Sequence, residues 1–126
     1  MVAAGLPRAA RLRRAGDFAA LRQAGGRHGG RCFSVRYRPN GLDHARLGLA
    51  ISKRVSKRAV ERNRIKRLVR ESFRRVRLQL PPVDVVVMAR EVAAGLPGPE
   101  LLVEIDALWR RLPPLKPIEP PGTIAR

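Results

Sequence analysis

The sequence contains a single cysteine, Cys32, among its 126 residues. One cysteine cannot form a disulfide framework or a cysteine zinc site, and it suits a reducing compartment. We therefore expect Cys32 to be a small packing residue and not a reactive thiol. No apolar run approaches membrane-spanning length, and the apolar residues 1–6 are too few for the core of a signal peptide. These absences predict a cytoplasmic protein with no membrane partner.

Groups that could support protein-based catalysis are also scarce. Acid–base or nucleophilic chemistry needs several matched groups in one cleft. The histidines, His28 and His44, lack the spacing of metal ligands, and we expect both to be exposed loop side chains. The glycine-rich loop at 25–30 lacks the Lys-Ser or Lys-Thr ending of a phosphate-binding loop. Asp84, inside an apolar run, is expected to be a structural hydrogen-bonding group. The sequence thus predicts no catalytic residues and no metal site.

Positive charge is what the chain has in excess, and it is localised. The net charge is +17 and the pI is about 11.9. Between residues 53 and 77, twelve Lys and Arg residues stand against Glu61 and Glu71, whereas residues 78–126 sum to −1. Such an asymmetric patch raises the local potential and attracts phosphates. We expect a polyanionic partner, namely a nucleic acid.

The hydrophobic pattern predicts one α/β domain. A 44% apolar content is too high for a disordered basic tail, and the length suits a single core. Alternating or continuous apolar residues predict strands at 31–38, 45–52 and 83–89. Apolar residues at three- and four-residue spacing predict helices at 17–24, 59–78 and 101–112. A turn is expected at 39–41.

The order of these elements also predicts how two strands pair. A helix at 59–78 between the strands at 45–52 and 83–89 implies that the strand at Leu47 and the strand at Val85 pair in parallel. Residues 1–112 are assigned to one nucleic-acid-binding α/β domain whose first twelve residues are expected to be flexible. Residues 113–126, rich in proline, are expected to form a disordered tail.

Two segments carry a family resemblance. Residues 46–54, RLGLAISKR, and residues 61–74, ERNRIKRLVRESFR, strongly resemble the protein subunit of bacterial ribonuclease P. Similar family segments match residues 17–18, 80–81 with 84–89, and 108–111, so the resemblance covers about residues 7–112. A single basic motif such as Arg-Asn-Arg at 62–64 is weak, but this ordered set is specific.

The resemblance implies a ribonucleoprotein, an endoribonuclease that removes the 5′ leader of precursor tRNA. In that family a large RNA provides catalysis and binds Mg²⁺, and the protein is an accessory subunit, here expected to be a monomer with one copy per RNA and no DNA partner. The implied fold is an α/β sandwich of order αβββαβα, with a four-stranded mixed sheet and the basic helix as a crossover, as in the second domain of ribosomal protein S5. A chain without its own catalytic groups agrees with this assignment.

The basic segment is the surface that the resemblance assigns to the catalytic RNA. On a helix, four of its cations follow four-residue steps and are expected to line one exposed stripe: Arg62, Lys66, Arg70 and Arg74. Guanidinium groups bind phosphate oxygens in bidentate fashion. A merely solvated helix face would need more acids than Glu61 and Glu71. The predicted RNA-docking residues are Lys53, Arg54, Lys57, Arg58, Arg62, Asn63, Arg64, Lys66, Arg67, Arg70 and Arg74.

The resemblance also implies substrate binding. Proteins similar to this family hold the single-stranded leader in a groove between the first helix and the sheet. The predicted groove residues here are Phe18, Arg22, Ser34, Arg36, Gly48 and Ala50. Phe18 is the candidate for stacking on an unpaired base, with ordinary core packing as the alternative. Related sequences often have aromatic residues where this chain has Arg22 and Arg36, so we expect phosphate contacts to replace stacking.

Two other classes of nucleic-acid binder fit parts of the pattern. A ribosomal or general RNA-binding protein would share the charge, the size and a related sandwich fold. A helix-turn-helix DNA binder would need a second helix packed across a short turn from the basic one, but Pro81, Pro82 and a valine-rich strand follow instead.

Overall fold

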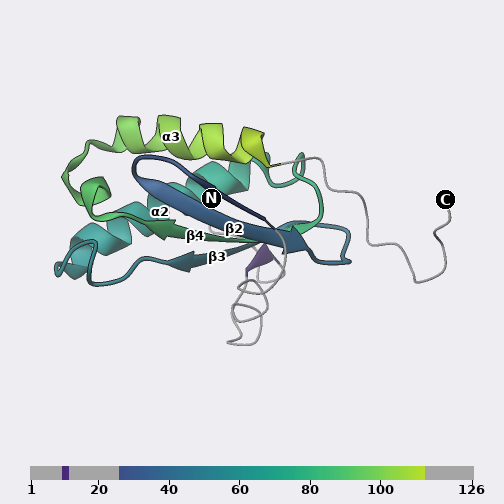
Figure 1. Cartoon of the computed structure of the whole chain (residues 1–126), viewed down its shortest axis with the longest axis horizontal. Coiled ribbons are helices and arrows are strands. Elements are labelled where there is room, and N and C mark those ends of the chain that lie inside the picture. Colours follow the sequence, from purple (N-terminus) through teal and green to yellow (C-terminus); the bar gives the residue numbers. More distant parts are fainter. Residues whose placement is uncertain (1–9, 12–25, 113–126) are drawn as a thin grey trace, which may run out of the picture.

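The computed structural model describes residues 10–11 and 26–112 (Figure 1). The predicted helix at 17–24, including Phe18 and Arg22, and the predicted tail at 113–126 lie outside the described residues. The described elements, in chain order, are β1 (Gly26–Gly29), β2 (Phe33–Pro39), β3 (Arg46–Ala50), α2 (Ala59–Val76), β4 (Val83–Ala89), the 3₁₀ helix η2 (Glu91–Gly95) and α3 (Gly98–Arg111).

The four strands form one mixed sheet in the order β1-β2-β4-β3. Strand β2 pairs antiparallel with β1 and with β4, while β3 and β4 are parallel and are joined by the crossover helix α2. Leu47 lies opposite Val85, which confirms the predicted parallel pairing. The central strand β4 is almost entirely buried, as its β-branched sequence predicts.

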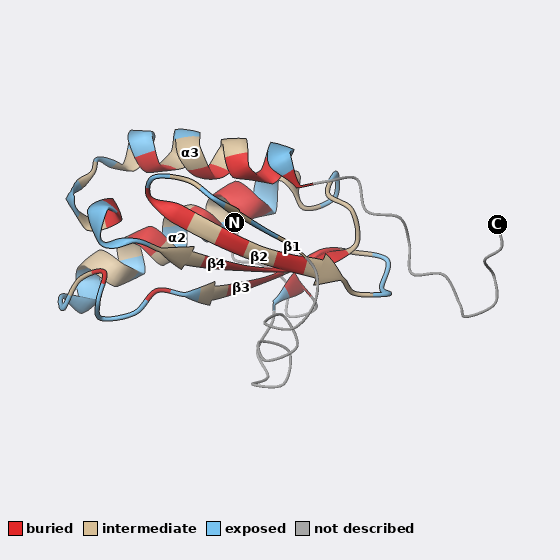
Figure 2. Ribbon diagram, viewed as in Figure 1, coloured by how far each residue is buried: buried red, intermediate tan, exposed pale blue. Residues whose placement is uncertain are grey.

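Helices α2 and α3 pack side by side and cover one face of the sheet (Figure 1). Figure 2 shows their buried residues turned toward the sheet. The apolar stripes of both helices meet the inward-facing valines of β2 and β4, and each fully buried side chain of this size contributes about 1.5–3 kcal/mol over exposure. The largest of these core residues are Phe33, Phe73, Ile65, Leu101, Ile105, Leu108, Val35, Val69, Val85 and Val87.

Strand β1 corrects the prediction that residues 25–30 form a loop. Its backbone pairs with β2 from Gly26 opposite Tyr37 to Gly29 opposite Ser34. The strand is not recognisable in the sequence because its glycines give no apolar alternation. One of these glycines is required for the close packing of β1 against β2. A Cβ atom on Gly26 would lie 2.3 Å from the Tyr37 Oη atom.

The predicted exposure of the two histidines is wrong. His28 is half-buried because its ring stacks on the Tyr37 ring, with 5.5 Å between centroids and 29° between planes. His44 is also half-buried, with Nδ1 2.8 Å from the Asp43 carboxylate. The hydrogen bond to His44 holds the pKa of Asp43 below its usual value.

Asp84 and the turn before β3 form one polar network, which confirms the structural role predicted for Asp84. Gly41 has a φ of 71°, and the Asn40 Oδ1 atom accepts from the Leu42 N–H group at 2.8 Å. The amide of Asn40 donates to the fully buried Asp84 at 3.0 Å. Arg46 donates to both oxygens of Asp84, each at 2.7 Å.

Cys32 is 2% exposed and packs in the core, as predicted. Burial, followed by the neighbouring Glu104 carboxylate, raises the pKa of its thiol. The Glu104 carboxylate also accepts the backbone N–H groups of Cys32 and Phe33 at 2.8 and 2.9 Å. These bonds anchor α3 to the start of β2. In the described part of the chain, no helix has both the length and the apolarity needed to cross a bilayer.

Candidate nucleic-acid interface

The loop before α2 is fixed by its own residues, so its cations point outward. Ile51 and Val55 are each only 6% exposed and anchor the loop in the core. The Ser52 hydroxyl accepts the Arg54 N–H group at 3.2 Å, and the Ser56 hydroxyl accepts the Arg58 N–H group at 3.1 Å. The four predicted docking residues of this loop are all exposed: Lys53, Arg54, Lys57 and Arg58.

The exposed face of α2 lies opposite its buried stripe and carries Asn63, Arg67, Arg70 and Arg74. The predicted stripe is therefore correct at Arg70 and Arg74, but Arg62 and Lys66 are half-buried on its flank. The reason is geometric. A helix turns once in 3.6 residues, so repeated four-residue steps drift around the axis, whereas alternating steps of four and three stay on one face.

Two predicted docking residues also make contacts within the protein. The Arg62 Nη1 atom donates to the Ser56 carbonyl at 2.9 Å and ties α2 to the preceding loop. The Arg64 Nη2 atom lies 3.1 Å from the Glu61 carboxylate and 3.3 Å from the Leu96 carbonyl, next to α3. A guanidinium has five N–H groups, so neither set of contacts exhausts the side chain. Both arginines can stabilise the helix position and contact a ligand.

Acids neutralise little of this surface. Glu71 accepts hydrogen bonds from Arg74, which hold the pKa of Glu71 below its usual value, and it lies 3.7 Å from the Arg75 Nε atom. Glu61 pairs with Arg64 on the flank of the helix. No described acid pairs with Arg67 or Arg70, so the middle of the exposed face keeps its positive charge.

The sheet provides a second surface, on the side away from α2 and α3. Here the register aligns the predicted groove residues in two adjacent rows across β2, β4 and β3. Ser34, Met88 and Ala50 form one row. Arg36, Val86 and Gly48 form the next. The structure therefore brings together the four predicted residues that it describes. Ala50 is exposed and Ser34 and Arg36 are half-buried, but Gly48 is buried.

A hollow of about 510 Å³ lies at the β1 end of this face, and its charged rim is a feature that the sequence did not reveal. Besides Ser34 and Arg36, it is lined by Arg27 of β1 and by Arg90, which follows β4. The Arg90 Nε atom donates to the Gly30 carbonyl at 3.0 Å and fixes the side chain over the β1–β2 turn. Arg27 and Arg90 are 63 residues apart in sequence, so only recognition of β1 as a strand could have united them.

No metal centre is built from the described side chains. Within residues 10–11 and 26–112, no three His, Cys, Asp or Glu residues gather closely enough to hold an ion.

Comparison with known proteins gives consistent matches. A family model described as Ribonuclease P matches residues 6–113. The ribonuclease P protein component of Thioalkalivibrio sulfidiphilus is 45% identical, over 86% of this chain and 90% of that protein. That of Cronobacter sakazakii is 44% identical, over 88% of this chain and 93% of the relative.

Solved structures give the same result for the fold. The RNase P protein of Thermotoga maritima superposes with a TM-score of 0.74 at 30% identity, covering 82% of this chain and 97% of that chain. The RNase P protein of Staphylococcus aureus gives 0.74 at 29% identity, covering 82% and 96%.

Proposed function

The chain belongs to the ribonuclease P protein family, and from this premise we propose that it docks on the catalytic RNA through α2 and binds the leader of precursor tRNA on its sheet. As a ribonuclease P protein component, it takes part in processing the 5′ end of tRNA within a ribonucleoprotein, and its partner is the ribonuclease P RNA. The observation that carries the finer proposal is the pair of cationic surfaces on opposite sides of one sheet.

Docking on the catalytic RNA uses the loop before α2 and the exposed face of the helix. Lys53, Arg54, Lys57 and Arg58 continue into Asn63, Arg67, Arg70 and Arg74 as one exposed surface, flanked by Arg62, Arg64 and Lys66. Each cation that meets a phosphate releases condensed counterions, so affinity falls with salt in proportion to the number of contacts. The proposed complex has one protein per RNA and works in the cytoplasm.

Catalysis in this proposal belongs to the RNA, with the protein as an assisting subunit. Mg²⁺ ions, coordinated mainly by RNA phosphates, supply the charge stabilisation and activated water that phosphodiester hydrolysis needs. The cationic surface of this protein repels free divalent ions, but it lowers the repulsion between RNA phosphates that those ions must otherwise screen. The protein therefore reduces the Mg²⁺ concentration that the complex requires.

The leader site is proposed to bind phosphates more than bases. Arg27, Arg36 and Arg90 line one hollow, and the exposed Ala50 continues the row of Ser34 and Met88 that also lines it. Guanidinium groups bind phosphate oxygens in bidentate fashion without reading the base sequence. On this proposal the protein accepts leaders of varied sequence, and Phe18 adds at most one stacked base.

The first experiment measures cleavage of a precursor tRNA by a bacterial ribonuclease P RNA at low Mg²⁺, with and without the purified protein. Stimulated cleavage at the mature 5′ end, with none by the protein alone, supports the accessory role. Tight RNA binding without stimulation would reject the accessory role in cleavage.

A second experiment tests the leader site with chemically altered substrates. Abasic nucleotides in the leader remove the bases, whereas methylphosphonate linkages remove the phosphate charge. We expect the abasic leader to retain most of its affinity for the complex and the methylphosphonate leader to lose it. In complexes that contain Arg36→Ala or Arg90→Ala, methylphosphonate linkages should not lower the affinity of the leader further. Equal losses for both leaders would reject binding through phosphates.

A further inference from the structure

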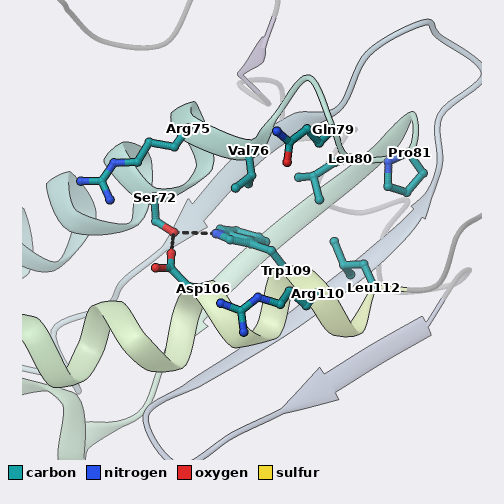
Figure 3. A pocket seen from close by; sticks show the side chains of 10 residues that line it. All are labelled: Ser72, Arg75, Val76, Gln79, Leu80, Pro81, Asp106, Trp109, Arg110 and Leu112. Carbon is teal, nitrogen blue, oxygen red and sulfur yellow. Dashed lines mark hydrogen bonds between the residues drawn. The ribbon is translucent and has the colours of Figure 1, made fainter.

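A separate pocket of about 440 Å³ lies between the C-terminal ends of α2 and α3 (Figure 3). Its volume falls within the range of about 300–1,000 Å³ that is usual for small-ligand sites. It lies on the helical side of the molecule, away from the sheet face of the leader site. Its lining is partly apolar, from Val76, Leu80 and Pro81, and partly charged, from Arg75, Asp106 and Arg110.

The inner wall of the pocket is rigid. The Trp109 indole is 3% exposed and packs edge-to-face on Phe73, with 5.5 Å between ring centroids. Its Nε1–H group donates to the Ser72 hydroxyl at 2.7 Å, and that hydroxyl donates to the Asp106 Oδ1 atom (Figure 3). Ser72 itself is fully buried. This chain of bonds fixes the Asp106 carboxylate toward the pocket.

Three charged groups at the pocket have unused hydrogen-bonding capacity. Among the described residues, the Asp106 Oδ2 atom has no hydrogen-bond or ion-pair partner. Arg110 on the α3 wall has none either, and Arg75 on the α2 wall has only the 3.7 Å contact with Glu71 (Figure 3). Cations in the last turn of a helix also complement its dipole, so the arginines alone would not indicate a ligand. The carboxylate oxygen fixed beside them adds an acceptor at a defined position, so the same pocket offers both donors and an acceptor to a ligand.

We propose that this pocket binds one unpaired nucleotide of the RNA partner, an inference that rests on the proposed function. Val76, Leu80 and Pro81 offer an apolar wall to a planar base, while Arg75 and Arg110 suit its phosphate. The pocket also continues the basic surface of α2, because Arg74 is exposed on that surface and Arg75 is the next residue. An RNA strand that follows the helix reaches the pocket.

The carboxylate makes the pocket selective among bases. The Asp106 oxygen is an acceptor and pairs with an amino group, as on adenine, cytosine or guanine. Uracil has no amino group, and its two carbonyl oxygens flank its single ring N–H group, so they would repel the carboxylate. The bound nucleotide therefore carries an amino-bearing base.

Trp109 provides the readout because it is the only tryptophan in the chain and its indole N–H group is hydrogen-bonded to the pocket wall. The full-length protein is titrated with AMP, GMP, CMP and UMP while the indole N–H signal is followed by NMR. We expect the first three to shift the signal saturably, with UMP about tenfold weaker, the size of one charge-assisted hydrogen bond. No shift with any nucleotide, or equal binding of UMP, would overturn the proposal.

Asp106→Asn gives a sharper test, because the amide keeps an oxygen for Ser72 and turns an N–H donor toward the ligand. We expect AMP to weaken about tenfold and UMP to become the better ligand, an inversion that loss of folding cannot produce. Arg110→Ala should weaken all four nucleotides, whereas the matched control Arg111→Ala, an exposed neighbour outside the lining, should not. An unchanged base order in Asp106→Asn would contradict the assignment.

The pocket and the proposed function can fail separately. If the protein stimulates cleavage by the catalytic RNA but neither nucleotides nor that RNA move the Trp109 signal, the pocket inference is wrong and the accessory role stands. If mononucleotides bind with the expected order but the protein does not stimulate cleavage, the accessory role is wrong. The nucleotide preference then remains as a property of the pocket.

Discussion

Asp84 shows how one residue joins the core to the functional face. It is fully buried in β4, and the register places it between Arg38 of β2 and Arg46 of β3, next to the row formed by Arg36, Val86 and Gly48. A buried carboxylate is tolerated only when charge and hydrogen bonds compensate for lost hydration. The bidentate contact from Arg46 and the amide of Asn40 provide that compensation. Asp84 thus fixes the end of the sheet face that the leader is proposed to use.

Asp84→Asn removes the buried negative charge that forms the bidentate ion pair with the Arg46 guanidinium, whose side chain is only 22% exposed. Breaking a buried pair in this way is expected to lower the free energy of unfolding by about 3 kcal/mol. Urea unfolding followed by circular dichroism measures the change. The control is Asp43→Asn, because the Asp43 side chain is 97% exposed and its loss should leave the unfolding midpoint unchanged. Equal midpoints for the two variants would show that the buried pair contributes nothing.

Cys32 gives a second prediction at this scale. Its thiol is buried and its pKa is raised, so the reactive thiolate is both scarce and inaccessible in the folded protein. We expect alkylation by iodoacetamide at pH 8 to be at least about a hundredfold slower in native protein than in urea, as for a thiol that reacts only after opening. Mass spectrometry of quenched samples follows the reaction. Similar rates in both conditions would place the thiol at the surface.

At the scale of elements, regular patterns were predictable and short irregular ones were not. The helix at 59–78 and the strand at 83–89 were predicted within two residues of α2 and β4, because eighteen and seven residues give a pattern room to repeat. Strand β1 has four residues, two of them glycine, so its side chains give no alternating apolar pattern. The 3₁₀ helix η2 was not predicted for a similar reason, since its five residues complete less than two turns.

The same limit applies to the candidate sites. Sequence placed the cations on α2, but their exact exposure depends on the phase of the helix, which the contacts of Ile65 and Phe73 with the core determine. Sequence also named Ser34, Arg36, Gly48 and Ala50 as one face. It could not supply Arg27 and Arg90, because their proximity follows from strand pairing across the sheet.

Arg64 and Arg67 are expected to separate structural from RNA-binding roles on one helix. Arg67 is exposed and has no described acidic partner, so Arg67→Ala should reduce the log–log salt slope of binding to the catalytic RNA by about one unit without changing stability. Arg64→Ala should reduce the slope similarly and also cost about 1 kcal/mol of stability, because it removes the contacts with Leu96 and Glu61. Filter binding over a salt series and urea unfolding measure both quantities. An unchanged slope would remove the residue in question from the interface.

At the scale of the whole molecule, the sheet separates two cationic surfaces. Helix α2 covers one side of the sheet (Figures 1 and 2), and the hollow lined by Arg27, Arg36 and Arg90 lies on the other side. Each surface is cationic, and both are held by the same rigid strands. On the proposed function, one protein of this size binds two RNA segments at a fixed separation, one from the catalytic RNA and one from the substrate.

This separation predicts that defects on the two sides are independent. Arg67→Ala should weaken binding to the catalytic RNA and leave the preference of the assembled complex for precursor over mature tRNA unchanged. Arg36→Ala should leave binding to the catalytic RNA unchanged and reduce that preference. Changes at distant sites without shared partners add within about 0.5 kcal/mol, so the double variant should show the sum of both effects. Binding measurements with catalytic RNA, precursor tRNA and mature tRNA across all four proteins complete the cycle. A coupling clearly larger than this value would mean that one RNA segment contacts both faces, and the sheet would then act as a single continuous binding surface.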